Sequence, residues 1–160
     1  MNEYLIVKWL HVLSSTVLFG TGLGSAYYMF FTSRVARRSG GDARAVAVVA
    51  RQVVRADAWF TTTTIVFQPL TGAWLIHLAG FPWTSAWIVG SIALYLLAGA
   101  CWLPVVWIQL RMRALAEAAA GSGAPLPAAY WRHFRHWTLL GIPAFAALVI
   151  VFWLMIAKPA

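Results

Sequence analysis

The sequence has very few acidic residues and a single cysteine. Only 4 of its 160 residues are Asp or Glu, whereas 12 are Lys or Arg. With only Glu3, Asp42, Asp57 and Glu117 as acids, catalysis by paired carboxylates is not expected. The lone Cys101 excludes a disulfide within the chain. The sequence also lacks any pattern typical of a hydrolase triad, a phosphate-binding loop or a closed zinc site.

Apolar residues dominate instead. The chain is 62% hydrophobic and 10% charged, with 10 Trp, a composition too apolar for an ordinary soluble domain. Four segments are long enough to cross about 30 Å of hydrocarbon as helices, namely residues 4–31, 58–80, 86–110 and 137–157. The sequence therefore predicts an all-α integral membrane protein, a four-helix bundle formed by one domain over residues 1–160. The first segment is not typical of a secretory signal, because its apolar run is too long and Lys8 lies within it, so we expect it to be retained.

The basic residues predict the orientation. Ten of the 12 Lys and Arg lie between the first and second spans or between the third and fourth, namely Arg34, Arg37, Arg38, Arg44, Arg51, Arg55, Arg111, Arg113, Arg132 and Arg135. The positive-inside rule makes these connections cytoplasmic and puts both termini on the outer side of a bacterial inner (cytoplasmic) membrane. The net charge of +8 fits this topology and contact with anionic membrane lipid, and no nucleic acid recognition module is visible.

The two basic connections have helix-boundary signals. Gly40 and Gly41 predict a break and Asp42 an N-cap, followed by an amphipathic helix that leads into the second span. The residues from Gly121 to Pro127 predict the break before the fourth span.

A histidine lies inside the first span. His11 is followed at alternating spacings of four and three by a mostly small stripe of Ser15, Leu18, Gly22 and Ser25. It would lie about 10 Å below the start of the helix, and an ionisable group at that depth is a functional-site hypothesis. Neutral imidazole is a common haem ligand, and small residues leave room for a flat macrocycle. Two structural alternatives remain: a hydrogen bond from His11 to a neighbouring helix, and close packing through Gly20 and Gly24.

The second span has a polar stripe of its own. It is formed by Asp57, Thr61, Thr64, Gln68 and Gly72. The stripe is expected to face the bundle interior, because Gln68 would be costly in lipid. Gln68 is a candidate for contacting a bound molecule or a neighbouring helix, whereas the threonines could bond to carbonyls of their own helix. Pro69 is expected to kink the helix.

The remaining histidines and Lys158 have weaker signals. His77 is about 180° from Gln68 on a straight helix, so an interfacial position is favoured over ligation of a metal. His133 and His136 indicate an interfacial cluster, in which His136 would be the first candidate for a second cofactor. Lys158 lies at the outer boundary near the level of Lys8, where snorkelling explains it. Together the two lysines could also form a cationic mouth for carboxylates such as porphyrin propionates.

The two ends of the sequence carry a resemblance. The "VKWLHV" of residues 7–12, followed by a basic loop, resembles the Lys-x-x-His opening of the HemJ-type membrane protoporphyrinogen oxidases, and Pro143 with Lys158-Pro159 is similar to the closing part of that family. The layout of the whole chain is closer to a related bacterial family of four-helix membrane proteins of unknown function. The "LLGIP" of residues 139–143 lacks an acid that commonly precedes the proline in HemJ-type proteins.

The resemblance implies a haem b-binding membrane redox protein. His11 would be an axial ligand of the haem iron, Lys8 and Lys158 would lie near the tetrapyrrole, and electrons would pass to a quinone or a respiratory partner. The second ligand is open between His77, Met155 and a histidine of another subunit in a homo-oligomer. A protoporphyrinogen-oxidase-like activity is one expectation. The rivals are a non-catalytic scaffold or subunit and a small transporter or metal-handling protein.

Overall fold

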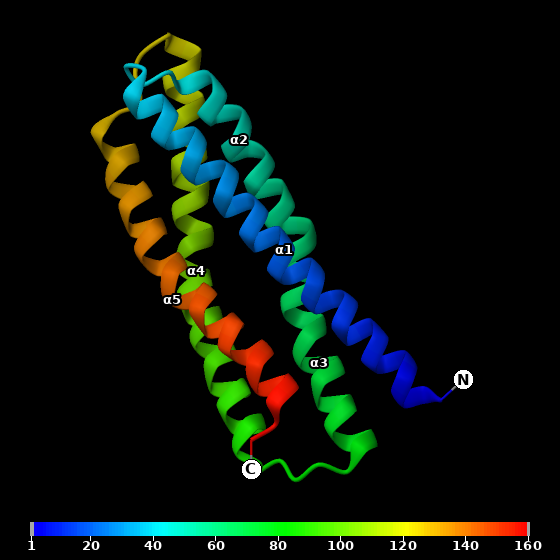
Figure 1. Cartoon of the computed structure of the whole chain (residues 1–160). Coiled ribbons are helices and arrows are strands. Elements are labelled where there is room, and N and C mark those ends of the chain that lie inside the picture. Colours follow the sequence, from blue (N-terminus) through cyan, green and yellow to red (C-terminus); the bar gives the residue numbers. More distant parts are fainter. Residues whose placement is uncertain (1, 160) are drawn as a thin grey trace.

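The computed structural model describes residues 2–159, all of whose regular elements are helical. The helices are α1 (Glu3–Arg38), α2 (Ala43–Ala56), α3 (Thr62–Ala79), α4 (Ala86–Ser122) and α5 (Ala128–Ala157), with a π-helical turn η1 (Asp57–Thr61) between α2 and α3. Because α2, η1 and α3 follow one another without a break, they form one rod, and the chain folds into a bundle of four rods (Figure 1). This confirms the all-α prediction and the continuous helix from the amphipathic segment into residues 58–80.

Within residues 2–159, three helices are long and apolar enough to cross a membrane: α1, α4 and α5. The fourth expected span, residues 58–80, coincides with the end of η1 and with α3, an 18-residue helix that is not among these three. Its transmembrane position and the side on which the termini lie stay predictions. Both termini lie at the end of the bundle where α3 turns into α4 (Figure 1).

The helices extend well beyond the predicted spans at the opposite end. The 37 residues of α4 are about 55 Å long, whereas the hydrocarbon core is about 30 Å thick. There the extensions of α1 and α4 pack against α2, and that of α5 packs along α4. Together they bury the main apolar core, in which Met112, Val46 and Tyr130 are fully buried. We refer to this part, which carries the ten arginines, as the basic end. A membrane span is recognised in a sequence by a continuous apolar run. These extensions are amphipathic, so they lie outside the predicted spans.

Two turns close the basic end, and both follow the sequence prediction. Asp42 caps α2, its Oδ1 accepting a hydrogen bond from the Arg44 amide at 3.0 Å. Gly41 has a φ of +89°, and a Cβ there would lie 3.0 Å from the Cβ of Pro125 in the other turn. The Gly41 carbonyl accepts a hydrogen bond from the Leu126 amide at 3.1 Å. Glycine is therefore required here both by the backbone conformation and by the close approach of the turns.

Toward the other end the helices separate. There α1 packs mainly along α3, and α4 along α5. Contact between α1 and α5 is made by large aromatic side chains: Phe19 with Phe145 and Phe152 at centroid distances of 4.5 and 5.3 Å, and Phe30 with Phe134 at 5.6 Å. Between these two aromatic contacts the bundle is hollow.

Candidate binding site

The hollow is a cavity of about 640 Å³ between α1 and α5, with η1, α3 and α4 behind it. Its volume falls within the range of roughly 300 to 1,000 Å³ found for small-molecule sites. Phe19 and Phe145 line it toward one end and Phe30 and Trp137 toward the other. Of the lining residues, Leu23, Tyr27, Phe31 and Ile142 are also exposed on the outer surface of α1 and α5. The cavity therefore opens sideways, between these two helices.

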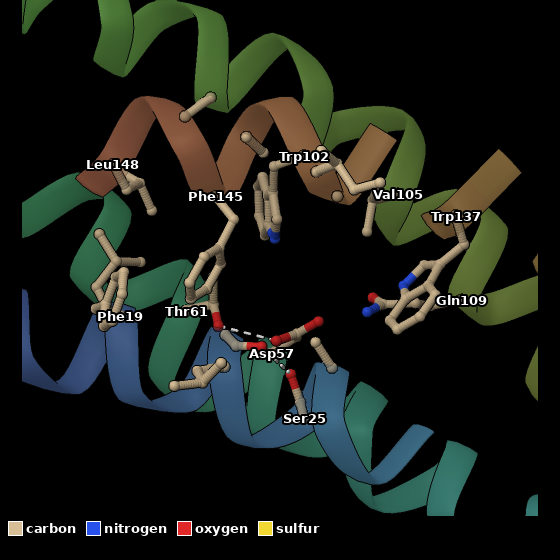
Figure 2. A pocket seen from close by; sticks show the side chains of 18 of the residues that line it. Phe19, Ser25, Asp57, Thr61, Trp102, Val105, Gln109, Trp137, Phe145 and Leu148 are labelled. Atoms are coloured by element: carbon tan, nitrogen blue, oxygen red, sulfur yellow. Dashed lines mark hydrogen bonds between the residues drawn. The ribbon is translucent and has the colours of Figure 1, made fainter. Parts of the chain in front are cut away.

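A few polar groups converge in this apolar cavity. Figure 2 shows Asp57, Gln109 and Trp102 directed into it from three sides. The side chains of Asp57 and Gln109 are only 7% and 4% exposed, and the Trp102 Nε1–H is buried without a hydrogen-bonding partner in the chain. We call these three residues the polar cluster. Because a buried polar group without a partner is costly, the free indole N–H is a place for an acceptor atom of a bound molecule.

The π-helical turn positions Asp57. Its Oδ1 accepts a hydrogen bond from Thr61 Oγ1 at 2.9 Å, four residues later on the same turn. A π turn inserts an extra residue into the helical repeat, and such turns are frequent at functional sites. Asp57 and Thr61 of this turn line the cavity together with Ile65 of α3, whereas Thr71 and Gly72 further along α3 lie against His11 of α1.

Only part of the predicted stripe of α1 reaches the cavity. Gly22 and Ser25 line it, whereas His11 and Ser15 are not among its lining residues. The Ser15 hydroxyl donates to the Val12 carbonyl of its own helix at 2.7 Å. Gln68 does not line the cavity either, and its Oε1 is buried without a partner.

His11 lies instead against α3. Its Nδ1 is 2.8 Å from Thr71 Oγ1, and a Cβ on Gly72 would be 3.4 Å from its Cε1. The Thr71 Oγ1 is also 2.9 Å from the Phe67 carbonyl, and when its hydroxyl donates there it can accept from His11 Nδ1. In that tautomer Nδ1 carries the ring proton, and Nε2 has a free lone pair in neutral histidine. The hydrogen bond to a neighbouring helix, foreseen as a structural role for His11, is present.

The other predicted residues lie apart from the cavity. Lys8 Nζ is 5.7 Å from the centroid of the Tyr4 ring, whereas Lys158 Nζ is 4.7 Å from that of Phe81 and 5.6 Å from that of Trp87. His77 and His136 are exposed on α3 and α5. Within residues 2–159 no group of three or more His, Cys, Asp and Glu side chains could hold a metal ion. Haem ligation by His11, His77 or His136 stays a prediction.

Two residues of the polar cluster were missed from the sequence. Trp102, Val105 and Gln109 recur at spacings of three and four on α4, and all three line the cavity. Gln109 is a lone amide in an otherwise apolar segment, which was the available signal. Hydropathy alone does not tell which face of such a helix points inward. The sequence therefore did not distinguish Trp102 from a tryptophan that faces lipid.

The chain was compared with known proteins. No curated protein and no solved structure matches it. Residues 5–159 match a family described as "Predicted integral membrane protein (DUF2269)". This match covers nearly the whole chain and agrees with the long apolar helices. The chain belongs to this family of predicted integral membrane proteins.

Proposed function

We propose that the protein binds a small lipophilic molecule taken from the bilayer into the cavity between α1 and α5. The observation that carries the proposal is the sideways opening. Its exposed margins, Tyr27 and Phe31 on α1 and Ile142 on α5, belong to helices long and apolar enough to span a membrane, so the opening would face lipid rather than water. The polar end of the molecule would meet the polar cluster, and its apolar body would lie toward Phe19 and Phe145.

Glycines in the helices provide the test. Gly22 lines the cavity, Gly24 on the same helix does not, and a Cβ at either position would meet no atom within 4 Å. Gly22→Leu should therefore project a branched side chain into the space that a bound molecule would occupy, and Gly24→Leu is the matched control with the same change in helix propensity. The probe is 3-trifluoromethyl-3-phenyldiazirine, a neutral lipophile that labels its surroundings on illumination.

The readout is the position of the label, mapped by peptide mass spectrometry in lipid nanodiscs. We expect labelling of Val105, which is 8% exposed but lines the cavity, alongside labelling of Leu103, which is 66% exposed. In Gly22→Leu the Val105 label should disappear while the Leu103 label remains, and Gly24→Leu should retain both. Labelling confined to Leu103, or a Val105 label that survives Gly22→Leu, would overturn the proposal.

Haem b binding is a second proposal, supported by the hydrogen bond between His11 and Thr71. Axial histidines bind iron through one ring nitrogen while the other donates to an acceptor that fixes the ring. The Thr71 hydroxyl can serve as this acceptor for Nδ1, which would leave His11 Nε2 for iron. The haem would supply electron transfer, with a quinone or respiratory partner as its acceptor, and oxidation of a tetrapyrrole is the enzymatic form of this proposal.

An absorption spectrum tests the haem proposal. Protein purified after haem supplementation should have a Soret band, which His11→Ala should abolish and Thr71→Val should shift by removing the acceptor for Nδ1. His77→Ala is the control on the same helix as Thr71. A colourless protein, or a spectrum unchanged by His11→Ala, would refute ligation by His11. The two rival functions, a scaffold and a transporter, remain predictions from the sequence. So do the homo-oligomeric state and the location in a bacterial inner membrane.

A further inference from the structure

From the charge and aromatic character of the cavity we infer that its ligand is a lipophilic cation, held by the Asp57 carboxylate in exchange for a proton. This inference rests on the proposed cavity binding and names the chemical class of the ligand.

Among the residues that the structure describes, Asp57 is the only one with a charged side chain in the cavity wall. No Lys, Arg or His among residues 2–159 lines the cavity. The two salt bridges in that range join Arg51 and Arg113 to Glu117, and Arg55, two residues before Asp57, is exposed. A carboxylate withdrawn from water without a cationic partner is strongly disfavoured. The partner would have to come from a ligand, or the carboxyl group would have to hold a proton.

The rest of the wall suits a cation with an apolar body. Eight aromatic residues line the cavity: Phe19, Tyr27, Phe30, Phe31, Tyr95, Trp102, Trp137 and Phe145. Aromatic ring faces attract cations, most strongly where water is excluded, and combine this with a large apolar contact area. The same wall disfavours an anion, because Asp57 would repel a carboxylate or phosphate and no basic group would balance it.

The surroundings of Asp57 contain no competing titratable cation. Packed against η1, helix α1 contributes Ser25 and the phenol of Tyr27 to the cavity, and α4 contributes Gln109 and the phenol of Tyr95. The residues that α5 adds, among them Trp137 and Thr138, have no charge, and α2 contributes none to the wall. Thr61 donates a hydrogen bond to the carboxyl group, which favours its ionised form.

Binding of the cation is then an exchange of one proton for one cation. The neutral carboxylic acid releases one proton to water and becomes the counter-ion of the bound cation, so that the charge in the cavity stays balanced. Since one proton leaves for each cation bound, affinity should fall at low pH by at most about tenfold per pH unit. Asp57 lies at the end of the cavity that is nearer to the basic end of the bundle. This position would give the proton a route to water on that side.

The test uses a pair of probes of the same shape and opposite charge, tetraphenylphosphonium and tetraphenylborate. Equilibrium dialysis of the purified protein in detergent measures both, and Gly22→Leu measures the uptake that does not involve the cavity. We expect saturable binding of tetraphenylphosphonium that weakens as the pH falls, and no saturable binding of tetraphenylborate.

Asp57→Asn keeps the shape of the side chain and an acceptor for Thr61, so the fold should be retained. It should weaken tetraphenylphosphonium binding by roughly 30-fold or more and remove its pH dependence. Equal binding of the two ions, or an unchanged affinity and pH profile in Asp57→Asn, would overturn the inference. If the neutral diazirine still labels Val105 while tetraphenylphosphonium fails, the cavity is a binding site for neutral molecules, and only the cation inference is lost.

Discussion

The clearest test of the packing behind the cavity concerns Tyr95 and Pro69. Proline has no backbone N–H, so the Ile65 carbonyl four residues before Pro69 loses its helical partner. The Tyr95 hydroxyl of α4 donates to that carbonyl at 2.7 Å. This bond links α4 to the rod formed by α2, η1 and α3, behind the cavity that Tyr95 lines. Tyr95→Phe therefore removes one hydroxyl and leaves a carbonyl without a donor.

The expected loss of stability follows from the unpaired Ile65 carbonyl. A buried polar group left unsatisfied costs about 1–3 kcal/mol, and hydrogen bonds measured in membrane proteins lie at or below the lower end of that range. We expect Tyr95→Phe to lower the free energy of unfolding by about 1–2 kcal/mol, which corresponds to a fall in melting temperature of about 3–6 °C for a chain of this size. The assay is thermal unfolding of the purified protein in detergent, where unfolding is reversible, or the apparent melting temperature otherwise.

Pro69→Ala provides the control for this interpretation. Alanine at position 69 restores an N–H that can donate to the Ile65 carbonyl, so the loss of the Tyr95 hydroxyl should matter less in that background. A double-mutant cycle should give a coupling of about 1 kcal/mol between the two positions. If Tyr95→Phe costs as much in the Pro69→Ala background as in the natural sequence, the hydroxyl does not compensate for the proline and the reasoning is wrong.

Three further predictions concern the basic end and its core. Gly41→Ala should lower stability by about 1–3 kcal/mol, because φ is +89° and a Cβ would crowd Pro125, whereas Gly121→Ala, with open space around it, should have no such cost in the same melting assay. Tyr130→Phe should cost about 1 kcal/mol, since it removes the buried hydrogen bond between the Tyr130 hydroxyl and Ser33 Oγ, which are 2.7 Å apart; an unchanged melting temperature would refute that bond. Met112→Ala, at a position that is 0% exposed, should cost about 2–5 kcal/mol, whereas Leu110→Ala, on the outer surface, should cost far less.

The sequence predicted the helices better than it predicted the site. Long apolar runs and the breaks at Gly40–Gly41 and Gly121–Pro127 mark the four rods, and Asp42 marks the start of α2. The predicted span of residues 86–110 is shorter than α4, because the last turns of the helix are amphipathic and bury their apolar face against α2 rather than in lipid.

The face of the second rod was predicted correctly, since Asp57, Thr61 and Thr64 are buried and so is Gln68 Oε1. The sequence did not tell which part of this stripe lines the cavity. Asp57 and Thr61, in the π turn, lie in the cavity wall, whereas Gln68, two turns further along α3, does not. The threonines were expected to bond to carbonyls of their own helix. Thr64 does so, whereas Thr61 bonds to the side chain of Asp57. A π turn depends on tertiary packing, so the sequence carried no signal for it.

Native mass spectrometry of protein purified from its membranes in mild detergent tests most directly whether the cavity between α1 and α5 holds a small molecule. We predict one bound molecule per chain in the natural protein and in Gly24→Leu, and none in Gly22→Leu. Identical spectra for the three proteins, with or without a bound molecule, would contradict the proposed binding.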